Sequence, residues 1–405
     1  MSNTLQQRIS KIRMGAASAA LALPVMLVAT VIMTQVAQAQ TFTDLYNFTG
    51  GSDGGYPYAG LVRDAGGNLY GTTGSGGSSG FGVVFKLNNK GTETVLHSFA
   101  GGSSDGEYPY GTLAVDAKGN LYGTAAGGGG TGCGGFGCGV VFEVNKKGTE
   151  TVLHSFTGGT TDGCYPHGSL LIDAKGNLYG TTDECGTSDL GTVFKVSKTG
   201  KETVLHSFAG GSSDGNYPFY ASVLMDTEGS LYGSTYYGGA SNEGVVYKLT
   251  KSGTLTVLHS FAGGTKDGCY PYGTPAMDTK SNLYGTTEHC GASSYGIVWK
   301  LSKKGTETVL HSFAGGASDG AYPVAGVIMD AKGNLYGDTA TGGSPDLGTV
   351  YELNKKGTVT LLHSFAGSDG EFPAGNLIWD VKGDLFGTAS AGGSDGYGTV
   401  WQITR

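Results

Sequence analysis

Short runs of β-branched, aromatic and leucine residues alternate with glycine-rich turns from residue 41 to the end of the chain. The clearest unit spans 111–165, and its pattern predicts strands at 113–116, 121–124, 140–144 and 151–156. Asp-x-x-Gly and Asn-x-x-Gly turns join these strands in pairs, because glycine supplies the positive φ that a tight hairpin requires. No segment after residue 40 keeps a helical period over three turns. The pattern therefore predicts an all-β chain.

The motif Asn-Leu-Tyr-Gly, or a close variant, marks each unit of an internal repeat. It returns at intervals of 50 to 57 residues, starting at Asn68, Asn120, Asn177, Ser230, Asn282, Asn334 and Asp384. A period near 50 with four short strands per unit is typical of a β-propeller.

The two ends of the repeat region complement each other. The region opens with only a fourth strand, at 44–48, and it closes with only the first three strands of a unit. Pairing these two parts would complete a blade and leave no open sheet edge. We therefore predict a closed seven-bladed β-propeller with four antiparallel strands per blade, in which the N-terminal strand joins the C-terminal three. A non-closing solenoid is the alternative, although solenoids usually carry capping repeats.

Three motifs of the repeat point to a known family. Asp-Ala-Lys-Gly-Asn-Leu-Tyr-Gly-Thr-Thr, Gly-Val-Val-Phe-Lys-Leu and Val-Leu-His-Ser-Phe resemble the glycine-rich GloVer (Gloeobacter/Verrucomicrobia-type) repeat of bacterial proteins, over essentially all of 41–405. The resemblance implies an exported protein and brings no established activity. The Asp-x-x-Gly-Asn-Leu-Tyr hairpin is also similar to that of NHL-type and lactonase-like propellers, which implies a fold and not a function.

The first 39 residues have the features of a targeting segment. Three basic residues precede an apolar run at 16–33, and Ala-Gln-Ala at 37–39 matches a signal-peptidase site. We predict a cleaved signal peptide at 1–39 and a single propeller domain at 40–405, in a secreted or periplasmic protein without membrane contact. An uncleaved membrane anchor is the alternative, because the apolar run approaches spanning length.

The charge of the chain limits its partners. Residues 1–39 carry three basic and no acidic side chains, so the net charge of −8 becomes about −11 for 40–405. This excess argues against nucleic acid or an anionic membrane as partner. We expect lysines on the face of the short hairpins and an acidic opposite face, which carries the Asp-Gly-x-Tyr-Pro loops. We expect no cofactor; calcium is the alternative that so many oxygen donors leave open, although no D-x-D-x-D-G loop occurs.

The six cysteines suggest three disulfides in an exported chain. Two pairs of cysteines occupy equivalent loop positions, each pair 21 residues apart, and the remaining two lie five residues apart. Paired C-x-x-C spacings are absent, which argues against a metal or redox centre. The predicted disulfides are Cys133–Cys138, Cys164–Cys185 and Cys269–Cys290.

Residues that recur in every unit are expected to serve the fold. The Asp-Gly-x-Tyr/Phe-Pro loop occurs seven times, and a histidine occurs six times in Leu-His-Ser-Phe. A single ligand rarely needs so many equal copies, so we read the loops as turns and the histidines as structural hydrogen-bonding groups. A glycan-binding ring of Asp and Tyr is the functional alternative.

A single binding site on a repeat protein must be marked by residues that break the repeat. A histidine replaces a tyrosine found in three other units, two pairs of aromatic residues crowd one blade, and acids and a histidine flank the bridging cysteines. Ordinary variation among loops is the alternative explanation. The candidate ligand-binding residues are His167, Tyr220, Tyr236, Tyr237, Glu184, Glu288 and His289.

The sequence favours a binding function over catalysis. It contains no phosphate loop, H-E-x-x-H motif or dinucleotide fingerprint, and no Ser-His-Asp order. We expect a monomeric scaffold that binds carbohydrate or a cell-envelope protein. The alternatives are a lyase, lactonase or glycan-cleaving enzyme that uses the central pocket, and a structural envelope protein.

Overall fold

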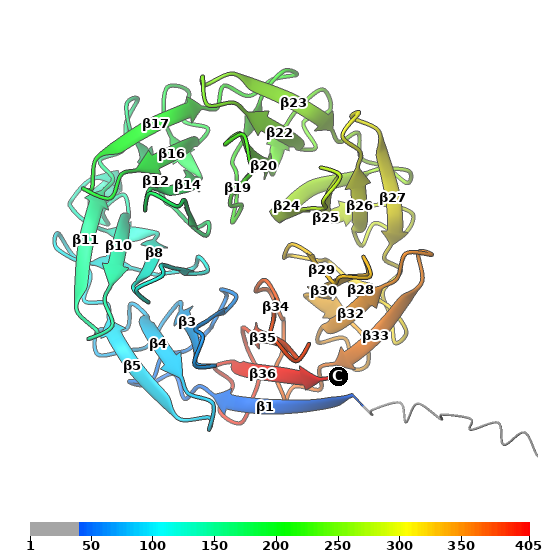
Figure 1. Cartoon of the computed structure of the whole chain (residues 1–405), viewed down its shortest axis with the longest axis horizontal. Coiled ribbons are helices and arrows are strands. Elements are labelled where there is room, and N and C mark those ends of the chain that lie inside the picture. Colours follow the sequence, from blue (N-terminus) through cyan, green and yellow to red (C-terminus); the bar gives the residue numbers. More distant parts are fainter. Residues whose placement is uncertain (1–39) are drawn as a thin grey trace, which may run out of the picture. The chain divides into compact units, whose positions relative to one another are not determined.

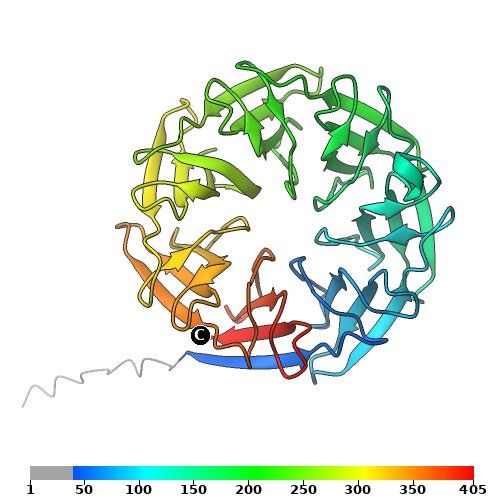
Figure 2. The same ribbon diagram turned by 180° about the vertical axis from the view of Figure 1, so that it is seen from behind.

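Seven four-stranded antiparallel sheets surround a central axis in the computed structural model of the chain (Figure 1). The structure describes residues 40–405, and the predicted signal peptide lies outside them. Figure 2 shows the same ring from behind, with the outer strand of each blade along the rim. The seven-bladed β-propeller that the repeat predicts is confirmed.

The first four blades have the same strand order, from the axis outward. Blade 1 contains β2 (Val62–Arg63), β3 (Leu69–Thr73), β4 (Val83–Leu87) and β5 (Glu93–Ser98). Blade 2 contains β7 (Ala114–Val115), β8 (Leu121–Ala125), β10 (Val140–Val144) and β11 (Glu150–Ser155). Blade 3 contains β13 (Leu171–Ile172), β14 (Leu178–Thr182), β16 (Thr192–Val196) and β17 (Glu202–Ser207). Blade 4 contains β19 (Leu224–Met225), β20 (Leu231–Thr235), β22 (Val245–Leu249) and β23 (Leu255–Ser260).

The last three blades follow the same order, and the seventh is built from both ends of the repeat region. Blade 5 contains β24 (Gly268–Met277), β25 (Leu283–Cys290), β26 (Ile297–Leu301) and β27 (Glu307–Ser312). Blade 6 contains β29 (Ile328–Met329), β30 (Leu335–Thr339), β32 (Thr349–Leu353) and β33 (Val359–Ser364). Blade 7 contains β34 (Ile378–Trp379), β35 (Leu385–Ala389), β36 (Thr399–Thr404) and β1 (Thr41–Asn47).

Short additional pairs extend four of the loop regions. They are β6 (Gly106–Glu107) with β9 (Gly127–Gly128), β12 (Gly163–Cys164) with β15 (Glu184–Cys185), β18 (Gly215–Asn216) with β21 (Tyr237–Gly238), and β28 (Gly320–Ala321) with β31 (Thr341–Gly342). A single 3-10 turn, η1 (Cys133–Gly135), lies between β9 and β10, and it is the one helical element among residues 40–405.

The ring closes as the sequence predicts. Strand β1 pairs antiparallel with β36, with Thr41 opposite Thr404 and Asn47 opposite Thr399. Every blade thus has four strands, although the innermost strand is only two residues long in six of the seven blades, shorter than the sequence pattern suggests.

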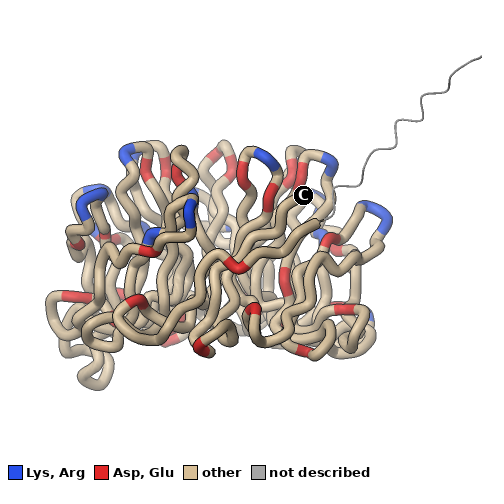
Figure 3. Tube along the Cα trace, turned by 90° about the horizontal axis from the view of Figure 1, so that it is seen from below, with Lys and Arg blue, Asp and Glu red and all other residues tan. Residues whose placement is uncertain are grey.

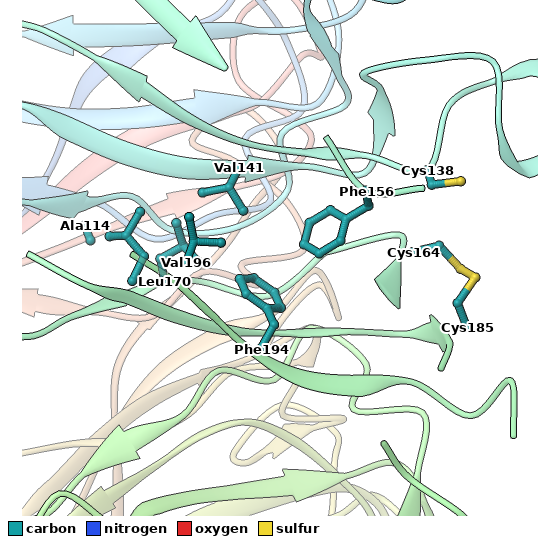
Figure 4. Close-up of a cluster of buried hydrophobic side chains, with 10 residues drawn as sticks. Ala114, Cys138, Val141, Phe156, Cys164, Leu170, Cys185, Phe194 and Val196 are labelled. Atoms are coloured by element: carbon teal, nitrogen blue, oxygen red, sulfur yellow. A yellow bond between two sulfur atoms is a disulfide. The ribbon is translucent and has the colours of Figure 1, made fainter. Parts of the chain in front are cut away.

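The hydrophobic core lies between neighbouring blades. A phenylalanine after each outer strand contacts an aromatic residue on the third strand of the next blade, with ring centroids 5.1–6.0 Å apart. Figure 4 shows one such pair, Phe156 and Phe194, between blades 2 and 3. The glycine of Asn-Leu-Tyr-Gly makes room for these rings: a Cβ on Gly123 would lie 2.4 Å from Phe142 Cζ. The repeat motif therefore encodes contacts between blades as well as hairpins.

A ring of hydroxyl groups joins the inner parts of the blades. Side chains on the second strands of six blades donate to an inner carbonyl of the next blade over 2.7–3.4 Å. In blade 6 this position is Asp338, which is 1% exposed. Neither carboxylate oxygen of Asp338 has a hydrogen-bond partner among the described residues, and burial raises its pKa well above the usual range. The donating residues are Thr72, Thr124, Thr181, Ser234, Thr286 and Thr388.

The three predicted disulfides are all present. Two of them tie a Tyr-Pro loop to the next loop of the same face, and the third closes the loop that carries η1. Disulfides are typical of proteins that mature in oxidising compartments. Across residues 40–405, no helix is both long enough and apolar enough to span a bilayer.

The charge distribution differs in part from the expectation. Lys and Arg gather along the edge that carries the short hairpins (Figure 3), as predicted. The repeated loop aspartates, however, are mostly buried; Asp105, for example, is 8% exposed. They accept hydrogen bonds from the loop backbone, so they stabilise turns and contribute little to an acidic surface.

Candidate functional site

A cavity of about 450 Å³ lies where the innermost loops of all seven blades meet, on the face of the Tyr-Pro loops. We call it the central cavity. Its volume is typical of sites for small molecules. The side chains that define it follow the proline of each loop by one or two residues, and they are Tyr58, Tyr110, His167, Tyr220, Tyr272, Val324 and Ala374.

The backbone of the Tyr-Pro loops fixes these side chains. The residue before each proline has a φ of 53–60°. Its N–H donates to the preceding blade, as Tyr108 N does to Phe81 O over 3.0 Å, and its carbonyl accepts from the following loop, as from Ala126 N over 3.1 Å. The loop aspartate anchors the base, since Asp105 accepts from Ala100 N over 2.7 Å. The recurring loop residues therefore serve the fold, as the sequence analysis predicts.

Aromatic rings form a continuous arc on the side of blades 1–5. The centroids of successive rings are 5.2–5.5 Å apart. Blades 6 and 7 present mainly small side chains on the opposite side, such as Val324 and Ala374, together with Phe372. The cavity is therefore one-sided in shape and chemistry, although the ring around it is nearly symmetric. We call the following residues the aromatic arc: Tyr58, Tyr110, His167, Tyr220 and Tyr272.

His167 differs from the other members of the arc because it has an acidic partner. Asp183 comes directly after β14 and is 2% exposed. Its Oδ2 lies 2.6 Å from His167 Nδ1, and its Oδ1 has no hydrogen-bond partner among residues 40–405. Burial disfavours the charged imidazole, but the Asp183 carboxylate outweighs this effect and raises the pKa of His167. Asp183 faces Nδ1 of the imidazole, and Nε2 is the ring nitrogen that is not paired with Asp183.

Three other predicted residues form a second cluster beside the arc. Tyr236 donates its hydroxyl hydrogen to Glu288 Oε2 over 2.8 Å, and His289 Nε2 lies 3.6 Å from Glu288 Oε1. The Tyr236 ring stacks on Tyr270 at 4.8 Å, and its centroid lies 6.4 Å from that of Tyr272. This cluster, which we call the Tyr236 cluster, is therefore continuous with the aromatic arc.

Two predicted residues lie at the margin of these groups. Tyr237 packs edge-on against Tyr236 at 4.9 Å. Glu184 is exposed and follows the buried Asp183. Burial of its carboxyl group and the neighbouring acids, Asp189 first, raise the pKa of Glu184.

The structure also brings in residues that the sequence analysis did not single out. Tyr58, Tyr110 and Tyr272 line the cavity, but they share a position that is tyrosine in several units, so irregularity did not mark them. Asp183 did break the repeat, because the equivalent residue is Gly74 in blade 1 and Ala126 in blade 2. The presence of a carboxylate where other units have glycine or alanine was the signal that could have revealed the pair of His167 and Asp183.

The lining of the central cavity limits the ligands that it suits. In the described part of the chain, no Lys or Arg lines it. Hydroxyl and amide groups do so, including Thr112, Ser169 and Asn376, and each also accepts a backbone N–H at 3.0 Å. No group of three possible metal ligands within residues 40–405 lies in this lining. The arrangement suits a neutral ligand with both apolar faces and hydroxyl groups.

Comparison with solved structures shows the fold. The streptogramin B lyase structure has a TM-score of 0.60 at 10% identity, over 90% of this chain and 97% of that one. A gluconolactonase from Xanthomonas campestris has a TM-score of 0.44 at 15% identity, over 90% and 89% of the two chains. At such identities the likeness concerns the fold alone. No curated protein matches the sequence.

Comparison with protein families gives a match over most of the chain. The model of the Gloeobacter/Verrucomicrobia repeat matches residues 30–138, 130–278 and 221–405, which together include every blade. The chain therefore belongs to the Gloeobacter/Verrucomicrobia repeat family.

Proposed function

We propose that this propeller is an extracytoplasmic binding module and that its central cavity binds a neutral carbohydrate. The observation that carries this proposal is the aromatic arc on one side of a cavity without lysine or arginine. Aromatic rings present apolar faces on which the C–H face of a sugar ring packs, and the hydroxyl on each tyrosine remains able to donate. The cavity volume of about 450 Å³ suits one or two sugar units.

The Tyr236 cluster supports a ligand longer than one sugar. It continues the arc outward from Tyr272, and it adds a carboxylate at Glu288 and an imidazole at His289. Both groups bond hydroxyls. We therefore expect an oligosaccharide whose end occupies the cavity and whose chain runs across the Tyr236 cluster.

Calorimetric titration of residues 40–405, with disulfides intact, against a panel of neutral oligosaccharides tests the proposal. Tyr220→Ala and Tyr272→Ala should each weaken binding at least tenfold, because each removes one stacking face. Phe136→Ala is the matched control: Phe136 is an aromatic side chain on a loop of the same face, 74% exposed, and it does not line the cavity. Repeating the titrations with calcium and with a chelator tests the calcium alternative.

Two results would overturn the carbohydrate proposal. One is the absence of binding to every glycan at millimolar concentration, which would favour a cell-envelope protein as partner. The other is binding that both tyrosine variants and the Phe136 control change equally, since this would place the ligand outside the cavity.

The His167–Asp183 pair supports a second candidate, an enzyme that uses the same cavity. A buried carboxylate that holds one ring nitrogen of a histidine leaves the other nitrogen to accept a proton, which is the arrangement of a general base. Lactone hydrolysis and proton abstraction in a lyase reaction both require such a base. A screen of lactones and uronate-containing glycans tests it: His167→Gln should abolish turnover and retain ligand binding. Turnover that survives this change would refute the assignment.

A further inference from the structure

Each seam between neighbouring blades carries a histidine or tyrosine of one outer strand beside an aspartate of the following loop. His97 with Asp105 is an example, at 3.2 Å. The start of the outer strand of the next blade lies alongside this pair. One residue at the start of that strand faces the seam, and its identity differs among the seven seams. In chain order from the seam of blades 7 and 1, it is Glu93, Glu150, Glu202, Leu255, Glu307, Val359 and Phe42.

The fold does not require glutamate at this position. Leucine, valine and phenylalanine occupy three of the seven seams, and Phe42 stacks on His363 with centroids 3.6 Å apart. The glutamates also lack partners: one carboxylate oxygen, Oε1, of each of the four is buried without a hydrogen bond to any described residue. A buried carboxylate oxygen beside an aspartate is unfavourable unless something compensates it. At the seams that carry a histidine, a bound cation would supply this compensation.

The histidine–aspartate distance changes with the glutamate. At the seams with Leu255, Val359 and Phe42, the shortest distance from Nε2 to a carboxylate oxygen is 3.1, 3.0 and 2.8 Å. At the three seams that combine a histidine with a glutamate, it is 3.2, 3.5 and 3.5 Å. In the two longer cases Nε2 is buried and has no hydrogen-bond partner within residues 40–405. At two of these three seams, those of His154 and His259, the imidazole is thus less tightly bound to the aspartate than at the seams without glutamate.

From these observations we propose that two seams bind a divalent transition-metal ion, with Zn²⁺ as the probe. The ligands at the seam of blades 1 and 2 are His97, Asp105 and Glu150. The ligands at the seam of blades 2 and 3 are His154, Asp162 and Glu202. In each set the three ligand atoms lie within 4.8 Å of one another.

One imidazole nitrogen and two carboxylate oxygens form a set that zinc accepts, with a water in the fourth position. Ligand atoms of a tetrahedral zinc site are roughly 3.3 Å apart, since each lies about 2.0–2.1 Å from the ion. The three ligand atoms would draw closer together to reach this geometry. The bound ion would join two neighbouring blades at the outer rim. This site is separate from the central cavity, so the zinc proposal does not depend on the proposal of sugar binding.

Zinc binding to the untagged protein, stripped with a chelator and dialysed, tests the proposal. We expect titration with ZnCl₂, with metal analysis after dialysis, to show sites that are lost in Glu150→Leu/Glu202→Leu, with a decrease of two ions per chain. Leucine is already present at the equivalent Leu255, so the double variant should fold, and circular dichroism checks this. Zinc should also raise the melting temperature of the wild type and not that of the double variant.

Two further variants make the test specific. Glu307→Leu should leave the zinc stoichiometry unchanged, because His259, Asp267 and Glu307 do not form a group whose ligand atoms all lie within 4.8 Å of one another. His206→Gln is the negative control and should change nothing. Zinc stoichiometry that is equal in the wild type and Glu150→Leu/Glu202→Leu would overturn the proposal, and so would the absence of zinc binding at micromolar concentrations.

Discussion

Asp338 is the position where we expect a single substitution to stabilise the protein. It replaces the hydroxyl that six other blades use to bond an inner carbonyl of the next blade, and it is 1% exposed. Its acceptor by analogy is the carbonyl of Gly375, which lies two residues after a proline, as Gly111 does in the bond from Thr72. An ionised carboxylate cannot donate to a carbonyl, whereas threonine can. Asp338→Thr changes the volume little and restores the donor.

The size of the effect depends on pH. Burial raises the pKa of Asp338 well above that of the unfolded chain. Between these two pKa values the folded protein holds one proton more than the unfolded chain, so stability falls as pH rises, by about 1.4 kcal/mol per pH unit. Below the unfolded pKa, protonated Asp338 can donate as threonine does, and the two proteins should be about equally stable. At pH 7 the variant should therefore be more stable than the wild type, by about 1.4 kcal/mol for each pH unit between the unfolded pKa and pH 7 over which folded Asp338 keeps its proton.

Urea denaturation at pH values from 3 to 8, followed by tryptophan fluorescence, measures this difference. Thr388→Asp is the matched reverse variant, because Thr388 is 0% exposed and donates to Ala59 O over 2.8 Å. It should lose stability and acquire the same pH dependence. The reasoning is refuted if Asp338→Thr and the wild type have equal unfolding free energies at pH 7 and a difference that does not change with pH.

Three further predictions concern other parts of the molecule. Replacing Cys164 and Cys185 by serine should lower the unfolding free energy by about 3 kcal/mol, as expected for a loop of this length; equal stability under oxidising and reducing conditions would contradict it. Burial, followed by the Asp53 charge, raises the pKa of Glu93 to about 7, so stability is lost as pH rises from the unfolded value through 7. Glu93→Leu should remove this loss in chelator-treated protein, which unfolding curves at pH 5 and 8 would show. If the enzyme proposal holds, turnover should rise with pH through a pKa above the usual histidine value, because Asp183 favours the protonated form of His167; a lower apparent pKa in the rate profile would argue against this base.

The repeat made the fold predictable, because each unit carries its own turn and strand signals and the ends of the region are complementary. The disulfides were predictable for a related reason: two pairs of cysteines occupy equivalent positions in different units. Geometry inside a unit was harder to predict. His167 was recognised as irregular, but its pairing with Asp183 depends on how a Tyr-Pro loop and the end of β14 meet.

The site residues that conform to the repeat were harder to predict from the sequence than those that break it. Tyr110 and Tyr272 were read as part of the common pattern, yet they line the central cavity because their loops point to the axis. Asp338 was visible as an exception in Leu-Tyr-Gly-Asp-Thr, but the sequence does not show that this side chain faces a carbonyl of the next blade. Orientation toward the axis or toward a neighbouring blade arises only when all seven blades are assembled.

The pairing of β1 with β36 has a consequence for the timing of folding. These strands lie at opposite ends of the described chain, so the last blade cannot form until nearly the whole polypeptide has been synthesised. Contacts over such a sequence separation are slow to form. Until then, the free edge of β1 and the unfinished first seam stay open to other chains, which favours aggregation. The ring that protects every edge in the finished protein therefore makes the growing chain dependent on protection from outside until its last strand arrives.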